Sequence, residues 1–125
     1  MQIMSLKLLH KGSEDERRWK IIDVSRKADR KYLPQLHVRL TSNETLENKR
    51  HIVRALANIA SDDSIPILLD VFRSSSGLIL GEFCRAFANL GLNQVIDDIE
   101  ALLQHNESFV RQEAMSALKK LGDSG

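Results

Sequence analysis

Cysteine is almost absent from this sequence, since Cys84 is the only one among its 125 residues. An internal disulfide and a cysteine-rich zinc cluster are therefore excluded, and a reducing compartment is the natural environment. No stretch approaches the about eighteen consecutive apolar residues that a membrane-spanning helix requires. The apolar run near the start is too short for the core of a signal peptide followed by a cleavage site. We therefore expect a cytoplasmic protein that makes no use of a membrane.

Metal and phosphate motifs are also missing. The four histidines form no HxxxH or HExxH pair, so a metal ion would need ligands gathered from separate helices. The stretch GLILG at 77–81 lacks the Lys-Ser/Thr step of a phosphate-binding loop, and we expect its glycines to ease the start of a helix or its close packing. We expect no metal and no cofactor.

Charge is present in both signs but unevenly placed. Residues 1–60 contain 13 Lys and Arg against 7 Asp and Glu, whereas residues 61–125 contain 5 against 10, under a net charge of +1. The basic half suits an acidic partner or a phosphate backbone, although scattered surface charge would give the same count. The opposite halves also allow the chain to associate with itself.

An apolar pattern recurs along the chain at a spacing of 31 residues. Its copies are HIVRALANIA (51–60), EFCRAFANLG (82–91) and EAMSALKKLG (113–122). The apolar positions fall at i, i+3, i+4 and i+7, which indicates a helix packed along one side. Each copy ends on a small residue, Ala60, Gly91 or Gly122, where a helix C-cap prefers glycine.

A second pattern alternates with the first. It covers residues 30–41, 62–73 and 93–104. Pro34 and Pro66 fit the first turns of two of these helices, and Asp62 or Asp63 is placed to cap the second. We predict an all-α fold, an α-solenoid of about three stacked helical hairpins plus a C-terminal closing helix. Residues 1–12 would form an N-terminal tail and residues 13–125 a single repeat domain.

These copies resemble a known family. Val110-Arg111, Ala114, Ala117-Leu118 and Leu121-Gly122 resemble the pattern of HEAT repeats, especially the short variety of the phycobilin (PBS) lyases. The stretches SIPILLDVF (64–72) and VIDDIEALL (95–103) are similar to the second helix of that repeat. The resemblance covers roughly residues 30–122. It implies stacked helix pairs whose second helices line a concave face, where partners bind.

The resemblance points to those positions of the second helices that do not belong to the repeating apolar pattern. They are Gln35, Val38, Ile67, Asp70, Arg73, Asp98, Ala101 and Gln104. Val38 and Ile67 would form an apolar spot among polar neighbours, which suits an anchor for a partner. We expect a protein-binding module, such as an adaptor, a chaperone-like protein or a regulatory subunit. The resemblance also implies an alternative, a subunit that assists bilin attachment to phycobiliproteins.

Candidates for catalysis have simpler structural explanations. Cys84 occupies the same position in its repeat as Val53 and Met115 occupy in theirs, so we expect a buried thiol that behaves as a small hydrophobic residue. The pair Asp62-Asp63 lies at a helix start, where capping and the helix dipole explain it. The pair Asp97-Asp98 follows shortly after the same point of its repeat. We therefore expect no enzyme.

The repeated phrase R-A-x-A-N places Arg54 and Asn58 in step with Arg85 and Asn89. We expect each Asn to bond backbone and each Arg to lie over its neighbours. A ladder of ligand-binding residues is the alternative.

The first helix is expected to open with the capping box Ser13-x-x-Glu16. It places Lys20, Asp23 and Lys27 where later copies have apolar or small residues, so it is either an end cap or a helix in another register.

Basic residues gather on this helix and the turn after it. They are Arg17, Arg18, Lys20, Arg26, Lys27, Arg30 and Lys31. Cations interleaved with the rings of Trp19 and Tyr32 could hold nucleic acid, the second alternative. Acidic neighbours dilute the cluster, and we expect Trp19 to pack under the second helix.

Overall fold

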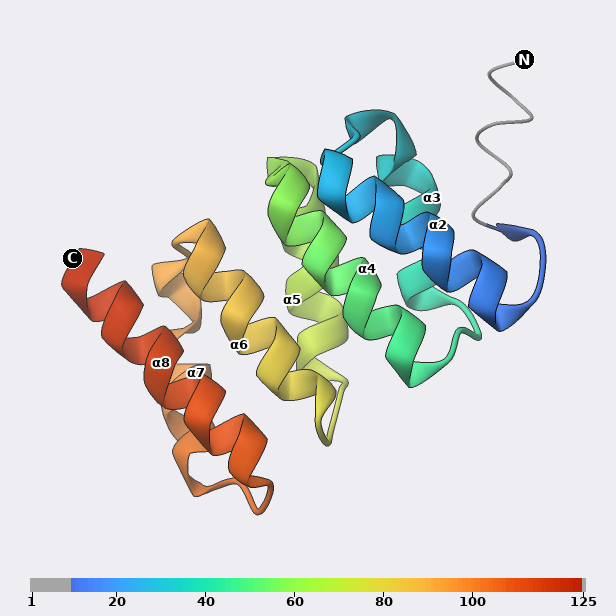
Figure 1. Ribbon diagram of the computed structural model, residues 1–125. Helices are drawn as coiled ribbons and strands as arrows, with labels where there is room; N and C mark the ends of the chain where they lie inside the picture. Colours follow the sequence, from blue (N-terminus) through green and yellow to red (C-terminus); the bar gives the residue numbers. More distant parts are fainter. Residues whose placement is uncertain (1–9, 125) are drawn as a thin grey trace. The chain divides into compact units, whose positions relative to one another are not determined.

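The computed structural model describes residues 10–124 and is made up mostly of helices (Figure 1). Several of these helices begin or end where the sequence predicts. The α-helices are α2 (Glu14–Lys27), α3 (Leu33–Thr41), α4 (Leu46–Ile59), α5 (Ile65–Arg73), α6 (Ile79–Leu90), α7 (Ile96–Ala101) and α8 (Ser108–Ser124). Short 3-10 helices are η2 (Arg30–Tyr32), η3 (Asp62–Ser64), η4 (Asn93–Val95) and η5 (Leu102–Gln104). Residues 10–124 contain no strand, and the predicted all-α helical-repeat fold is confirmed. Most of the predicted tail over residues 1–12 lies outside the described residues.

Helix α2 begins as predicted. The hydroxyl of Ser13 accepts a hydrogen bond from the Glu16 N–H at 3.2 Å, while the Glu16 carboxylate accepts one from the Ser13 N–H at 3.1 Å. This reciprocal pair is the capping box, so the start of α2 is confirmed. In the next copy, Thr45 caps α4 by accepting a bond from the Asn48 N–H at 3.3 Å.

The ends of the first helices agree with the prediction in part. The C-cap of α4 is Ala60 and that of α6 is Gly91, both with left-handed backbone, and α2 has a C-cap of the same kind at Ala28. Gly122 was expected to end a helix too, but it lies inside α8. That prediction was wrong because the apolar stripe ends at Leu121 while the backbone hydrogen bonding continues.

The second helix of each pair starts with a three-residue 3-10 turn at the predicted repeat positions. The predicted cap by Asp62 or Asp63 is wrong, because the hydroxyl of Ser61 accepts the bond from the Asp63 N–H at 3.3 Å. Ser61 is the residue with extended backbone, which is the conformation that an N-cap needs. The aspartates therefore occupy the first turn, where their charge favours the helix dipole.

The chain divides into two compact units, one ending at Val71 and the other beginning at Phe72. In the first unit, α2 packs along α4, and α3 packs against α4 (Figure 1). In the second unit, α6 packs along α8, and α7 packs against α8. The single domain predicted over residues 13–125 stays a prediction.

Each unit has an apolar core formed by residues of the predicted repeating pattern. In the first unit these include Ile21, Leu36, Leu40, Ile52, Val53, Leu56 and Leu68, all fully buried. In the second unit they include Phe83, Cys84, Phe87, Ile99 and Ala114. Met115 was expected in the same column as Cys84 but is 65% exposed, because α8 turns this side of the helix to solvent.

Close packing of α6 on α8 depends on a glycine. A Cβ atom placed on Gly81 would lie only 2.4 Å from Cε2 of Phe109, so any larger residue collides with the ring. The close-packing role expected for this glycine is confirmed. Gly77, at the other end of the same motif, has a φ of +78°, which suits the turn before α6.

Candidate functional site

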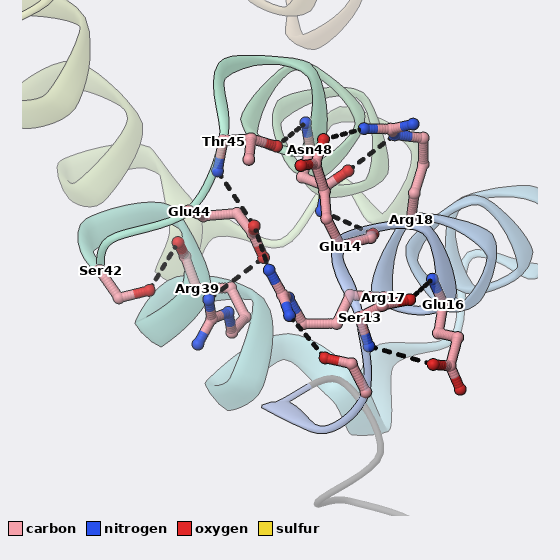
Figure 2. A network of polar contacts seen from close by, with 11 residues as sticks. Ser13, Glu14, Glu16, Arg17, Arg18, Arg39, Ser42, Glu44, Thr45 and Asn48 are labelled. Atoms are coloured by element: carbon pink, nitrogen blue, oxygen red, sulfur yellow. Dashed lines mark hydrogen bonds and ion pairs between the residues drawn. The ribbon is translucent and has the colours of Figure 1, made fainter.

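A buried carboxylate is the centre of the polar network that Figure 2 shows. The side chain of Glu44, in the loop between α3 and α4, is fully buried. Arg17 binds it in bidentate fashion: its Nε atom donates to one carboxylate oxygen and its Nη2 atom to the other, each at 2.9 Å. Arg39 donates to one oxygen at 3.1 Å, and the N–H of Thr45 donates to the other at 3.0 Å. The network fastens α2 to the turn that joins α3 and α4.

The protonation state of Glu44 follows from these contacts. Burial by itself raises the pKa of the carboxyl group, but the hydrogen bonds from Arg17 and Thr45 outweigh burial and lower the pKa to about 2. The group therefore stays ionised near neutral pH and has no proton to donate. Its role is structural.

Neighbouring basic residues are also engaged. The Nε atom of Arg18 donates to the buried side chain of Asn48 at 2.8 Å, and Arg18 pairs with Glu14 and, at 3.3 Å, with Asp15. The Asn48 amide in turn donates to the backbone carbonyl of Glu14 at 3.1 Å. Arg17 and Arg18 thus hold α2 in place rather than offering their charge to a ligand.

The rest of the predicted basic cluster is partly neutralised. Arg26 and Lys27 both contact Asp23, at 3.2 and 3.1 Å, and Lys31 lies 3.7 Å from Asp29. Arg30 is exposed on η2. The sequence therefore overstates the positive potential of this region, because carboxylates on the same helix turn balance much of it.

A pocket of about 330 Å³ lies beside α2 and η2. It is lined by Trp19, Lys20, Asp23, Val24, Lys27, Asp29, Lys31 and Tyr32. Trp19 was expected to pack under the second helix, but 70% of it is exposed. That expectation was wrong because the core face of α2 carries Ile21 and Val24, and Trp19 is on another side of the helix.

The residues nominated on the second helices differ in exposure. Val38 is 54% exposed, and Asp70, Arg73, Ala101 and Gln104 are exposed as well. Ile67 and Asp98 are half-buried, and Asp98 lies 3.5 Å from Arg73.

Gln35 contradicts its nomination as a surface residue. Only 7% of it is exposed, and neither polar atom of its amide has a hydrogen-bond partner. The error arose because α3 is buried over a wider arc than the apolar columns indicate.

Cys84 and His37 have the environments of structural residues. Burial, followed by the nearby charge of Glu113, raises the pKa of the Cys84 thiol to about 12, so it stays protonated and inaccessible. The Nε2 atom of His37 lies 2.8 Å from the Ser64 hydroxyl, and burial lowers the pKa of this ring. Among residues 10–124 no group of three or more His, Cys, Asp or Glu side chains is placed to hold a metal ion.

The repeated Asn and Arg residues connect neighbouring first helices. Asn58 donates to the carbonyl and hydroxyl oxygens of Ser25 at 3.2 and 3.0 Å, and so links α4 to the last turn of α2. In the second unit, Asn89 accepts a bond from Lys120 at 2.8 Å. Arg85 forms a bidentate pair with Glu113, at 3.2 and 2.9 Å. These contacts favour the structural interpretation over a ladder of ligand-binding residues.

Comparison with known families agrees with this architecture. Residues 49–74 match the family model described as PBS lyase HEAT-like repeat. The matched segment begins within the first turn of α4 and extends through η3 and α5, so it covers most of one helix pair. No curated protein matches the chain. In the described part of the chain, no helix combines the length and apolar character needed to cross a membrane.

Proposed function

We propose that this chain is a non-catalytic protein-binding module of the cytoplasm, with its binding surface on the second helices of the HEAT-like pairs. Helical repeats of this kind generally present surfaces to other proteins. The observation that carries the proposal is the exposure of Val38 on α3. This aliphatic side chain is 54% exposed and is not part of the buried core. An apolar side chain that a polar rim surrounds is the arrangement from which the buried centre of an interface is built.

The polar residues of this surface supply specificity. Asp70 and Arg73 are exposed on α5, and Gln104 is exposed on η5. Ala101, exposed at the end of α7, adds a small apolar contact. The pair of Arg73 and Asp98 has more than a third of each side chain in solvent, so it contributes little to stability and can exchange partners.

A matched pair of variants tests the proposal. Val38→Arg removes the proposed anchor, and Leu46→Arg changes a side chain that is 50% exposed on the first helix α4. Proteins captured from the native lysate at high salt are expected to be lost with Val38→Arg and kept with Leu46→Arg. Equal capture by both variants would place the binding surface elsewhere, provided that both keep the wild-type circular dichroism.

The name of the matched repeat supports an alternative function, assistance in attaching bilins to phycobiliproteins. Cys84 is buried with a raised pKa, so this chain offers no accessible thiol to carry a bilin covalently. A saturable change in visible absorbance after mixing the protein with a free bilin would favour this alternative over the binding module.

A further inference from the structure

The pocket between Trp19 and Tyr32 is formed where α2 departs from the repeat. Lys20, Asp23 and Lys27 occupy positions that are apolar or small in the later copies, and all three line the pocket. The corresponding residues of α4, 32 positions later, are Ile52, Ala55 and Ile59, and all are buried. The three departures from the repeat therefore lie together. They place charged side chains around a pocket on α2, where the equivalent side of α4 is apolar and buried.

We propose that this pocket binds an acidic peptide segment of a partner protein through one bulky apolar side chain. The site goes beyond the proposed function, because it belongs to α2 and η2 and uses none of the residues nominated on the second helices. Its features are an exposed indole ring, a second aromatic ring, and a rim of lysines.

The size and the aromatic walls fit a side chain. A volume of about 330 Å³ lies at the lower end of ligand pockets, which run from about 300 to 1,000 Å³. Val24 and the two rings supply the apolar surface, and Trp19 leaves 70% of its area in water until a ligand covers it. Tryptophan and tyrosine in such settings are the residues that most often dominate a binding interface.

The charge of the rim selects an acidic ligand. The pocket lining contains three lysines and two aspartates. Arg26 and Arg30, which are adjacent in sequence to lining residues, are exposed. Lys27 and Lys31 are oriented by Asp23 and Asp29, at 3.1 and 3.7 Å. Each ammonium group has three N–H donors, so a carboxylate of the ligand can join the existing pair.

The carboxylates distinguish a peptide from a nucleic acid. Hydrogen bonds from Lys27 and Arg26 lower the pKa of Asp23, so this group stays negative near neutral pH. A phosphate backbone has acceptors but no hydrogen-bond donors, so it has no group that the carboxylates of Asp23 and Asp29 could bind. A peptide backbone has an N–H at nearly every residue, and these carboxylates can accept from it.

Trp19 is the only tryptophan, so its fluorescence reports on the pocket directly. The probes are synthetic peptides of about a dozen residues, rich in Asp and Glu, with one central Leu or with Ala in its place. A basic peptide with the same Leu and an oligothymidylate complete the set. We expect a saturable blue shift with the acidic Leu peptide, and a much weaker response to the other three.

Matched variants assign the response to the rim. Lys27→Gln with Lys31→Gln is expected to weaken binding of the acidic Leu peptide roughly tenfold at low salt and to flatten its salt dependence. The control, Lys11→Gln with Lys119→Gln, removes the same charge from exposed positions outside the pocket and should stay within about twofold of wild type.

Tyr32 tests the aromatic wall. Tyr32→Ala should weaken binding roughly tenfold, whereas Tyr32→Phe should retain it. Three results would each overturn the proposal: no saturable shift with the acidic Leu peptide, an equal response to the Ala peptide, or an oligothymidylate response that equals or exceeds the peptide's. Val38→Arg should leave the titration unchanged, so failure here and failure of the second-helix surface are distinguishable.

Discussion

Replacing Glu44 by glutamine perturbs a buried side chain that accepts four hydrogen bonds. The glutamine fills the same space, but it removes the charge and replaces one acceptor oxygen by an amide N–H₂, which then faces Arg17 and either Arg39 or Thr45. The pKa of Glu44 falls from its ordinary value of 4.5 to about 2 in the folded chain. At about 1.4 kcal/mol for each pKa unit, the charged state contributes about 3 kcal/mol to folding. A loss of this size is a large share of the stability of a typical domain.

The effect of Glu44→Gln should depend on pH in a defined direction. Because the folded pKa of Glu44 lies below the unfolded one, its contribution is fully present above about pH 4.5 and is lost as the pH falls toward about 2. The wild-type protein and the variant should therefore differ by about 3 kcal/mol at neutral pH and converge in acid.

Urea unfolding at several pH values measures this difference. Circular dichroism follows the whole chain, and the fluorescence of Trp19 follows the unit that contains Glu44. The control is Glu47→Gln, which removes a half-exposed carboxylate 3.8 Å from Arg50 and should change the free energy of unfolding by less than about 0.5 kcal/mol. The reasoning is refuted if the two variants are equally stable at neutral pH, or if the curves for wild type and Glu44→Gln run parallel down to acid pH.

Three further predictions concern packing and burial. Gly81→Ala should destabilise the second unit by about 1–3 kcal/mol, because its Cβ overlaps the ring of Phe109, and adding Phe109→Leu should recover part of the loss in thermal melts. Gln35→Leu should raise the free energy of unfolding by about 1 kcal/mol, since both buried amide atoms lack partners, and a loss in urea titrations would count against this reasoning. Cys84, with its pKa raised to about 12, should resist a thiol reagent in the native chain even at mildly alkaline pH and react fully in urea.

The helices themselves were predictable because their signals are local. The apolar spacing, the capping box at Ser13 and the small residues at Ala60 and Gly91 each act within one or two turns of chain. The spacing of 31 or 32 residues then placed the second helices, whose 3-10 starts fall at the expected positions.

The features that escaped prediction depend on contacts between elements. Arg17 and Glu44 are 27 residues apart, and nothing in either neighbourhood marks them as partners. Gln35 has a polar side chain at a position that packing nevertheless buries. Trp19 is the reverse case, because a strongly apolar residue is expected inside until the neighbouring helices decide which face is covered. The pocket did leave a trace, namely the three charged residues that break the repeat on α2.

The left-handed residues that end the first helices differ in a way that bears on folding. Ala28 and Ala60 have φ values of 50° and 57°, a conformation that costs a residue with a Cβ about 1–2 kcal/mol, whereas Gly91 adopts it freely. The turn after α6 can therefore form from backbone preference alone. The turns after α2 and α4 hold their shape only while the helices on both sides are packed. Of the three turns that end the first helices, the one after α6 is therefore the least strained.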